Sequence, residues 1–176
     1  AKILDADENG RGEIALKGPM VMQGYYKNEE ETAKVFTADG YLLTGDVGYL
    51  DRENYLYLTG RKKNMIVTEG GKNVYPEEIE DYFQLYDEIE QIMVKGYVLD
   101  EKMKTEAIEA FVYPTEDFTK SRDKDAVQLR IEEIIDEVNR ELLPYQRISR
   151  VKVLSEPMEM TTTKKIKRFA VEEGEE

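Results

Sequence analysis

The pattern of apolar residues changes at a short basic junction, Leu58-Thr59-Gly60-Arg61-Lys62-Lys63, and this change determines the fold. Before the junction, short apolar segments alternate with glycine-containing and acidic turns, as expected for β-strands. After it, apolar residues recur at both strand and helix spacing. We therefore place a domain boundary here, with a β part before it and an α+β part after it.

The β part contains several short elements. Residues 12–17 alternate polar and apolar side chains and end at Gly18-Pro19, which predicts a strand and a turn. Asn28 can cap a short helix that extends to Phe36, because Glu29 to Glu31 suit its positive N-terminal end. Three further β segments are expected at residues 41–43, 47–50 and 55–58, with residues 51–54 as a hairpin turn.

The α+β part begins with two short strands, 65–67 and 73–75, around a Gly70-Gly71 turn. Pro76 suits the first position of a helix that reaches about Leu85. The pattern then predicts strands at 92–98, 107–113 and 148–154, and one long helix at 123–142 that ends before Pro144. We expect an α+β fold: a small antiparallel sheet flanked by helices, preceded by a β segment from the end of a larger domain.

Composition limits the possible chemistry. The chain has a net charge of −13, which argues against nucleic acid as a partner, because phosphate backbones need a basic surface. There is no Cys and no His, so thiolate catalysis and the commonest general base and metal ligand are excluded, and no metal site is expected. No apolar run is long enough for a transmembrane segment. The missing Cys fits a reducing compartment, and a cytoplasmic location is expected.

Four motifs could carry chemistry, and each has a simpler explanation. Asp46, after Thr44-Gly45, could accept bonds from two ribose hydroxyls or could cap its own turn. Arg61 could bind phosphate or hydroxyls, or could belong to a solvated linker. The Gly70-Gly71 turn lets backbone approach a ligand closely, but a plain hairpin turn explains it equally well. The cationic segment 161–168 could bind phosphate or be a solvated tail.

The order and spacing of these motifs resemble the adenylate-forming superfamily of acyl-CoA synthetases, adenylation domains and luciferases. The closest resemblance is to the C-terminal part of a long-chain fatty acyl-CoA ligase. The matching segments are Gly12-Glu13-Ile14, Gly24-Tyr25-Tyr26, Thr44-Gly45-Asp46, Gly60-Arg61-Lys62-Lys63, Gly70 to Glu80 and Lys165-Ile166-Lys167-Arg168.

The resemblance implies an AMP-forming acid–thiol ligase that works in two steps. ATP and a fatty acid give an acyl-adenylate, and the thiol of CoA then displaces AMP. By resemblance, Asp46 and Arg61 bind the nucleotide, Lys63 is the hinge and Lys165 is the catalytic lysine. Gly70, Gly71 and Lys72 match the loop beside the CoA path. The residue before the catalytic lysine is usually Gly in the family and is Lys164 here, so Lys164 is the alternative for this role.

The resemblance also implies a domain plan. Residues 1–61 are expected to end a large N-terminal domain, 62–64 to form the hinge, 65–170 to form the C-terminal domain and 171–176 to be a disordered tail. The expected partners are fatty acid, ATP, CoA and the N-terminal domain, while peripheral membrane contact stays open. The Mg²⁺ ligand, the phosphate-binding loop and the acyl pocket are expected outside these residues, so this chain alone is predicted to be inactive.

Three alternatives remain open at this point. The enzyme could use another carboxylic acid, or it could pass the acyl group to a carrier protein instead of CoA. A third possibility, from a different class, is a non-catalytic binding module with the same fold. The acyl chain length and the oligomeric state cannot be read from these residues.

Overall fold

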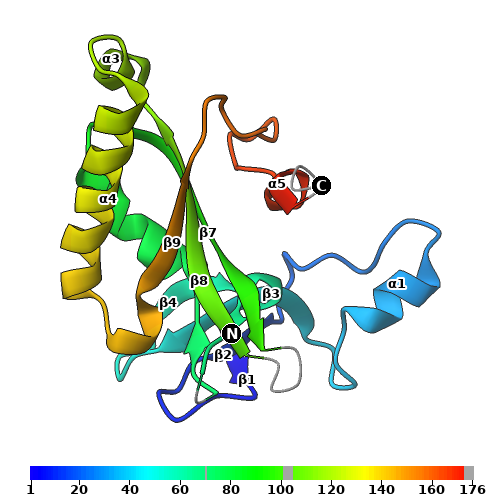
Figure 1. Ribbon diagram of the computed structural model, residues 1–176. Coiled ribbons are helices and arrows are strands. Elements are labelled where there is room, and N and C mark those ends of the chain that lie inside the picture. Colours follow the sequence, from blue (N-terminus) through cyan, green and yellow to red (C-terminus); the bar gives the residue numbers. More distant parts are fainter. Residues whose placement is uncertain (70, 101–104, 173–176) are drawn as a thin grey trace. The chain divides into compact units, whose positions relative to one another are not determined.

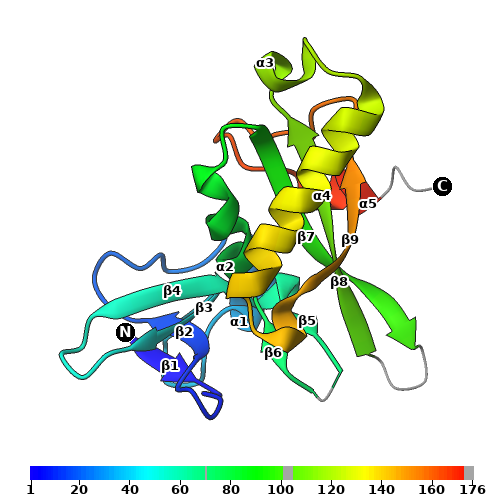
Figure 2. The ribbon, with the colours of Figure 1, turned by 60° about the vertical axis from the view of Figure 1, so that its left-hand side comes forward.

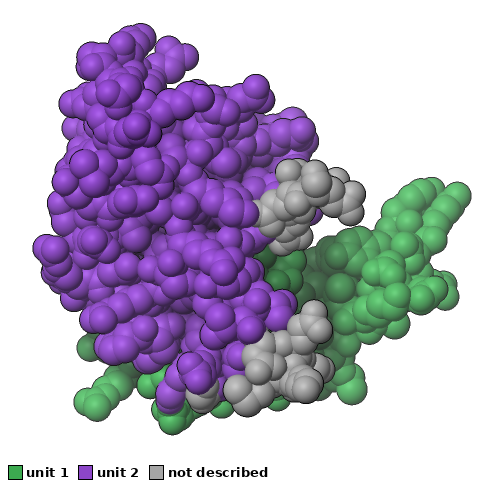
Figure 3. Space-filling model, viewed as in Figure 1, with its two compact units in different colours: residues 1–65 green, residues 66–176 purple. Residues whose placement is uncertain are grey.

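The computed structural model describes residues 1–69, 71–100 and 105–172. The chain forms two compact units, Ala1–Met65 and Ile66–Glu176, which Figure 3 shows in different colours. The division falls directly after the basic junction of the sequence. Each unit has its own sheet and its own buried apolar residues.

The first unit is built on a four-stranded antiparallel sheet. Its strands, in the spatial order β1-β2-β3-β4, are β1 (Lys2–Leu4), β2 (Gly12–Leu16), β3 (Leu42–Leu50) and β4 (Leu56–Arg61). A short helix, α1 (Glu29–Lys34), begins as predicted at Asn28, whose side chain accepts the N–H of Glu31 at 3.1 Å. A 3₁₀ turn, η1 (Lys62–Asn64), follows β4.

The prediction of separate β segments at 41–43 and 47–50 was wrong, because β3 runs through both of them. Glu13 pairs with Val47 and Ala15 pairs with Leu43, so residues 44–46 of β3 lie opposite the single residue Ile14. The extra residues form a β-bulge, a local irregularity that leaves the strand continuous. Thr44-Gly45-Asp46 is therefore a bulge inside a strand and not a turn between strands.

The second unit alternates helices and strands. Its first elements are β5 (Ile66–Val67), β6 (Asn73–Val74), α2 (Pro76–Glu80) and the 3₁₀ turn η2 (Asp81–Leu85). They are followed by β7 (Ile89–Asp100), β8 (Thr105–Pro114), α3 (Glu116–Thr119), α4 (Lys124–Glu141), the 3₁₀ turn η3 (Pro144–Gln146), β9 (Ile148–Val153) and α5 (Arg168–Glu172). Pro76 occupies the start of α2, and Asp123 caps α4 by accepting the N–H of Ala126 at 2.8 Å.

The main sheet of this unit is mixed and not antiparallel as predicted. Strand β7 pairs with β8 in the antiparallel sense, but β8 pairs with β9 in the parallel sense. Parallel neighbours need a long crossover, and α3 and α4 supply it by carrying the chain back along the sheet. The predicted positions of the three strands were correct, while the pairing sense depended on this crossover.

Helices α4 and α5 lie on opposite faces of the β7-β8-β9 sheet, as Figures 1 and 2 show. The α4 face holds the main core, which includes Ile131, Ile134, Val138, Val94, Ile108 and Val112. The α5 face holds a smaller cluster of Met93, Phe111 and Met158, against which Leu154, Ile166 and Val171 pack. The segment that carries the predicted catalytic lysine follows this second face.

The disordered tail was predicted to begin at residue 171, but α5 extends to Glu172. Val171 and Glu172 are the last residues of α5, because Val171 packs on the smaller apolar cluster. Residues 173–176 of that tail lie outside the described residues.

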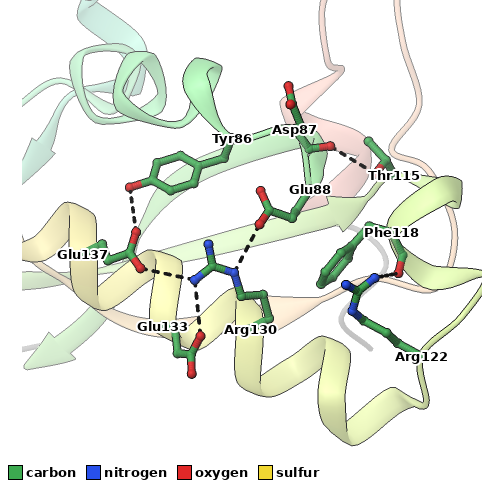
Figure 4. A network of polar contacts seen from close by, with 9 residues as sticks. All are labelled: Tyr86, Asp87, Glu88, Thr115, Phe118, Arg122, Arg130, Glu133 and Glu137. Carbon is green, nitrogen blue, oxygen red and sulfur yellow. Dashed lines mark hydrogen bonds and ion pairs between the residues drawn. The ribbon is translucent and has the colours of Figure 1, made fainter.

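An ionic network, shown in Figure 4, links α4 to the segment before β7. Arg130 lies 3.2 Å from a carboxylate oxygen of each of Glu88, Glu133 and Glu137. The hydroxyl of Tyr86 donates to Glu137 at 3.2 Å. The network is partly exposed, so it orients the helix while the buried apolar residues contribute most of the stability.

Candidate functional site

The bulge in β3 places Asp46 beside Arg61. The two residues are direct cross-strand partners in the pairing of β3 with β4. The Nη1 of Arg61 donates to Oδ1 of Asp46 and, at 3.4 Å, to the carbonyl oxygen of Thr44. The side chains of Asp46 and Arg61 are 35% and 46% exposed. A carboxylate and a guanidinium thus stand together at the surface, where they can take hydroxyls and an anion from a ligand.

The bulge is held by two hydrogen bonds of the Thr44 side chain. The hydroxyl of Thr44 donates to the carbonyl oxygen of Ile14 at 2.8 Å and accepts the N–H of Asp46 at 3.1 Å. Gly45 has a φ of +69°, in the left-handed region that favours glycine. Each residue of the Thr-Gly-Asp motif therefore has a structural role: Thr bonds the bulge to β2, Gly adopts its left-handed backbone and the Asp carboxylate accepts a bond from Arg61.

Glu13 was quoted in the motif of β2, but sequence reasoning gave it no role. One of its carboxylate oxygens accepts the N–H of Gly45 at 3.2 Å, and the other accepts a bond from Nζ of Lys62 at 2.7 Å. The Glu13 side chain is only 10% exposed, and its bond to Lys62 raises the pKa of that lysine. Glu13 and Lys62 are 49 residues apart, so no local sequence pattern could reveal this contact.

The predicted hinge residue Lys63 lies in η1, next to this contact. Lys62 is bonded to Glu13, and Ile66 is buried in the second unit at 2% exposure. Residues 63–65 are therefore the short connection between a residue anchored in the first unit and one anchored in the second. The Lys63 side chain is exposed.

The predicted glycine loop is the turn between β5 and β6. The N–H of Gly71 donates to the carbonyl oxygen of Thr68 at 3.0 Å, and the N–H of Thr68 donates to that of Lys72 at 3.0 Å. Gly71 has a φ of +70°, and a Cβ there would meet nothing within 4 Å, so the backbone conformation alone requires glycine. Gly70 lies outside the described residues, and the side chain of Lys72 is exposed.

The β5–β6 hairpin is attached to the main sheet of its unit. The N–H of Val67 donates to Oε2 of Glu106 in β8 at 3.0 Å. Ile66 and Val74 are buried in the main core. The turn thus projects from a fixed base.

Lys165 lies on an exposed turn after β9. Its carbonyl oxygen accepts the N–H of Thr161 at 2.7 Å, and its own N–H donates to the hydroxyl of Thr161 at 3.1 Å. Lys164 has a φ of +58°, the conformation that glycine adopts most easily. The Lys165 side chain is exposed, so its ammonium group is accessible to a ligand.

The structure therefore brings together Asp46 and Arg61 in the first unit. It places Gly71 and Lys72 on one turn of the second unit and Lys165 on another. Among the described residues, no group of three or more Asp or Glu side chains could hold a metal ion. In the same part of the chain, no helix combines the length and apolar character needed to cross a membrane.

Comparison with known protein families gives the class. A family model described as the AMP-binding enzyme C-terminal domain matches residues 63–174. The match begins at the predicted hinge residue and covers the second unit. This chain belongs to that family, the C-terminal domains of adenylate-forming enzymes.

Its relatives include two kinds of acid–CoA ligase. A long-chain fatty acid–CoA ligase of Bacillus subtilis is 45% identical over 101 residues, covering 57% of this chain and 17% of the relative. A 2-succinylbenzoate–CoA ligase of Listeria innocua is 40% identical over 131 residues, covering 74% of this chain and 27% of the relative. This chain thus spans about a sixth to a quarter of the length of these relatives.

Solved structures show the same fold. The ATP-bound RpMatB-BxBclM chimera B1 matches with a TM-score of 0.78 and 27% identity, covering 98% of this chain and 33% of that protein. The o-succinylbenzoate CoA synthetase of Bacillus subtilis, in complex with its acyl-adenylate intermediate, matches with a TM-score of 0.73 and 27% identity. In that case 92% of this chain and 30% of the synthetase are covered.

Proposed function

We propose that this chain is the C-terminal part of an ATP-dependent acid–CoA ligase that first forms an acyl-adenylate and then an acyl-CoA thioester. One observation carries the proposal: the surface pair Asp46 and Arg61 directly precedes the segment that matches the family of AMP-binding enzyme C-terminal domains. A nucleotide-binding pair followed by a separately folded unit is the arrangement that an adenylate-forming enzyme needs. The ATP-bound and adenylate-bound relatives support ATP as a substrate.

Asp46 and Arg61 are proposed to bind the nucleotide. The carboxylate of Asp46 can accept bonds from both ribose hydroxyls, and the guanidinium of Arg61 can donate to oxygen atoms of the same ligand. The two side chains form an ion pair with each other, so a carboxylate and a guanidinium lie next to each other for the same ligand. The Mg²⁺ that accompanies ATP is proposed to be held by residues outside this chain.

Lys165 is proposed to stabilise adenylation. Attack of a carboxylate on ATP brings anionic groups together, and a positioned ammonium group lowers that barrier electrostatically. The backbone of Lys164 supports Lys165 as the catalytic lysine. Lys164 has a left-handed backbone, which suits glycine, and the family usually has Gly directly before the catalytic lysine.

The Gly70-Gly71-Lys72 turn is proposed to lie beside CoA in the second step. Glycine leaves room for the backbone to approach a narrow thiol-bearing chain, and an exposed lysine can meet the phosphates of CoA. A Cβ at Gly71 would meet no atom within 4 Å among the described residues outside its chain neighbours.

The proposed acid is a long-chain fatty acid. The relative with 45% identity is named as a long-chain fatty acid–CoA ligase, which favours this choice. A second candidate is 2-succinylbenzoate, because the ligases named for it match over 74% and 98% of this chain. Transfer to a carrier protein is the remaining alternative.

The first unit supports the proposed partnership with a larger N-terminal domain. Strand β4, at one edge of the sheet, exposes a run of apolar side chains, Leu56, Tyr57 and Leu58, at 39%, 47% and 72%. Contiguous exposed apolar side chains usually mark a surface that another protein part covers. We propose that the remainder of the N-terminal domain covers them.

The test is a panel of acids given to the full-length enzyme that carries this chain. AMP release is measured with and without CoA, using palmitate, octanoate, 2-succinylbenzoate and acetate. The proposal expects AMP release that depends on both ATP and CoA and is fastest with palmitate. Fastest release with 2-succinylbenzoate would identify the second candidate, and no AMP release with any acid would contradict a ligase.

A further inference from the structure

The turn that carries Lys165 is anchored at its base by a buried glutamine. Gln91 in β7 is 6% exposed and faces the backbone of Met158. Its Oε1 accepts the N–H of Met158 at 2.6 Å, and its Nε2 donates to the carbonyl oxygen of Met158 at 3.4 Å. The side-chain amide thus pairs with both the backbone N–H and the backbone C=O of one residue, as a neighbouring strand would, and it fixes the chain just before the turn.

A second anchor lies just after the turn. The Nη2 of Arg168 donates to both carboxylate oxygens of Glu80 at 2.7 Å, and its Nη1 donates to the carbonyl oxygen of Val94 at 2.8 Å. Oε1 of Glu80 also accepts the N–H of Val94 at 2.7 Å. The guanidinium, the carboxylate and the backbone N–H and C=O of Val94 therefore form a closed ring of bonds, which joins Glu80 to Arg168, 88 positions away.

This second anchor is shielded from solvent. The side chains of Glu80 and Arg168 are 18% and 24% exposed, and Glu77 lies 3.8 Å from Arg168. Burial raises the pKa of Glu80, and the positive charge of Arg168 opposes that rise. Loss of the arginine would leave the buried Glu80 carboxyl group without its charged partner.

Between the two anchors the segment supports itself. Met160 and Ile166 form a β-bridge, and Nζ of Lys167 lies 2.9 Å from Oε2 of Glu159. Met158 and Ile166 also pack in the apolar cluster on the α5 face of the sheet. Residues 159–165 are exposed, and the tip of this turn, residues 161–165, presents Lys165.

We propose that Arg168, acting through Glu80, and Gln91 are positioning residues that hold Lys165 in place for the adenylation step. The inference rests on the proposed function, in which Lys165 acts on the reacting groups. A cation stabilises a transition state only if it stays within hydrogen-bond distance, and a displacement of about 1 Å can lower a rate by about a hundredfold. The two anchors, one on each side of the exposed tip, would limit such a displacement of Lys165.

The experiment is a double-mutant cycle in the full-length enzyme. Arg168→Gln, Lys165→Ala and the double variant are compared by ATP–pyrophosphate exchange, with palmitate as the acid, and by thioester formation from supplied palmitoyl-adenylate. Arg168→Gln is expected to slow exchange by about 10- to 100-fold and to change thioester formation by less than about threefold. In the Lys165→Ala background, Arg168→Gln should slow exchange by less than about a further threefold, because the ammonium group that Arg168 positions is already absent.

Two further variants keep the test decisive. Arg130→Gln is the matched control, because it breaks another multi-partner arginine of the same unit that has no bond to the lysine turn (Figure 4). It should leave both half-reactions within about twofold of the wild type. If Arg168→Gln does not accumulate in folded form, Glu80→Gln replaces it, because the amide can still accept the N–H of Val94 while losing its charge.

The outcomes separate this inference from the proposed function. If Lys165→Ala leaves exchange unchanged, the proposed role of Lys165 is wrong, and the positioning role of Arg168 is then wrong as well. If Lys165→Ala slows exchange but Arg168→Gln does not, only the positioning role is wrong. Independent, multiplicative losses in the double variant, or equal losses in both half-reactions, would mean that Arg168 acts on general stability.

Discussion

Asp46 and Arg61 face each other across β3 and β4, and the guanidinium of Arg61 donates to the Asp46 carboxylate directly beside the β-bulge at Gly45. The bulge aims the carboxylate and the neighbouring strand supplies the cation. The pair is therefore formed by sheet register. In the proposed function, the same two side chains bind the nucleotide.

Replacement of Asp46 by Ala is expected to raise the KM for ATP by about 10- to 100-fold. The loss corresponds to about one charge-assisted hydrogen bond, worth about 1.5–3 kcal/mol, and about 1.4 kcal/mol changes a constant tenfold. The measurement is pyrophosphate exchange against ATP concentration. Asp51→Ala is the control, because the Asp51 carboxylate accepts backbone N–H groups, from Glu53 and Tyr55, and lies in the β3–β4 turn. An equal rise in KM for both variants would contradict nucleotide binding by Asp46.

Replacement of Gly45 by Ala is expected to lower the free energy of unfolding by about 1–2 kcal/mol, the strain of a left-handed backbone in a residue with a Cβ. The added Cβ would lie 3.6 Å from Nη2 of Arg61, an ordinary contact, so strain and not overlap dominates. Gly10→Ala is a matched control, with a φ of +76° and nothing within 4 Å of the added Cβ. Denaturant unfolding should show similar losses for both, while only Gly45→Ala should raise the KM for ATP.

Replacement of Lys165 by Ala should slow adenylation by roughly 10²–10³-fold, the size typical for loss of one electrostatic stabiliser. Thioester formation from supplied acyl-adenylate should change much less. Lys164→Ala is the neighbouring control, and it should have the smaller effect because Lys164 occupies the left-handed position of the turn. A larger loss for Lys164→Ala in pyrophosphate exchange would place the catalytic lysine one residue earlier.

Replacement of Lys63 by Pro tests the hinge. In the proposed function, adenylation and thioester formation use different groups of the second unit, so the unit is expected to rotate about a few residues. Proline restricts φ at its own position and limits the residue before it. Adenylation should survive within about tenfold, and thioester formation should fall by more than about a hundredfold, or about 2.7 kcal/mol in the barrier. Lys63→Ala is the charge control, and equal losses in both half-reactions for Lys63→Pro would remove the hinge assignment.

Asp39 is expected to titrate far below an ordinary aspartate. A bond from Lys2 at 2.8 Å, and then one from the hydroxyl of Thr37 at 2.6 Å, lower its pKa from 3.8 to about 2. Since the folded-state pKa is the lower one, the stabilisation is present above pH 3.8 and is lost as the pH falls towards about 2. NMR titration of the Asp39 carboxyl measures it, and in Lys2→Met the midpoint should return towards 3.8. An unchanged midpoint in that variant would contradict the role of Lys2.

Local sequence was enough to predict most elements of the second unit. Pro76 began a helix, Asp123 capped α4 and alternating apolar residues marked β7, β8 and β9, because each signal acts within a few residues. The sense of the β8–β9 pairing was not predicted, since it depends on how far α3 and α4 carry the chain along the sheet. The start of the tail was missed as well, because the contact of Val171 with the Met93–Phe111 cluster crosses the whole unit.

The candidate site divides in the same way. The sequence by itself determined the family resemblance, the junction after Arg61 and the residue types Asp46, Gly71 and Lys165, because motifs preserve spacing along the chain. Only the tertiary structure decided that Asp46 sits in a bulge facing Arg61, that Glu13 holds Lys62, and that Glu80 and Gln91 anchor the Lys165 turn. Those contacts join residues 15 to 88 positions apart, and they exist because strand register and packing bring distant side chains within hydrogen-bond distance.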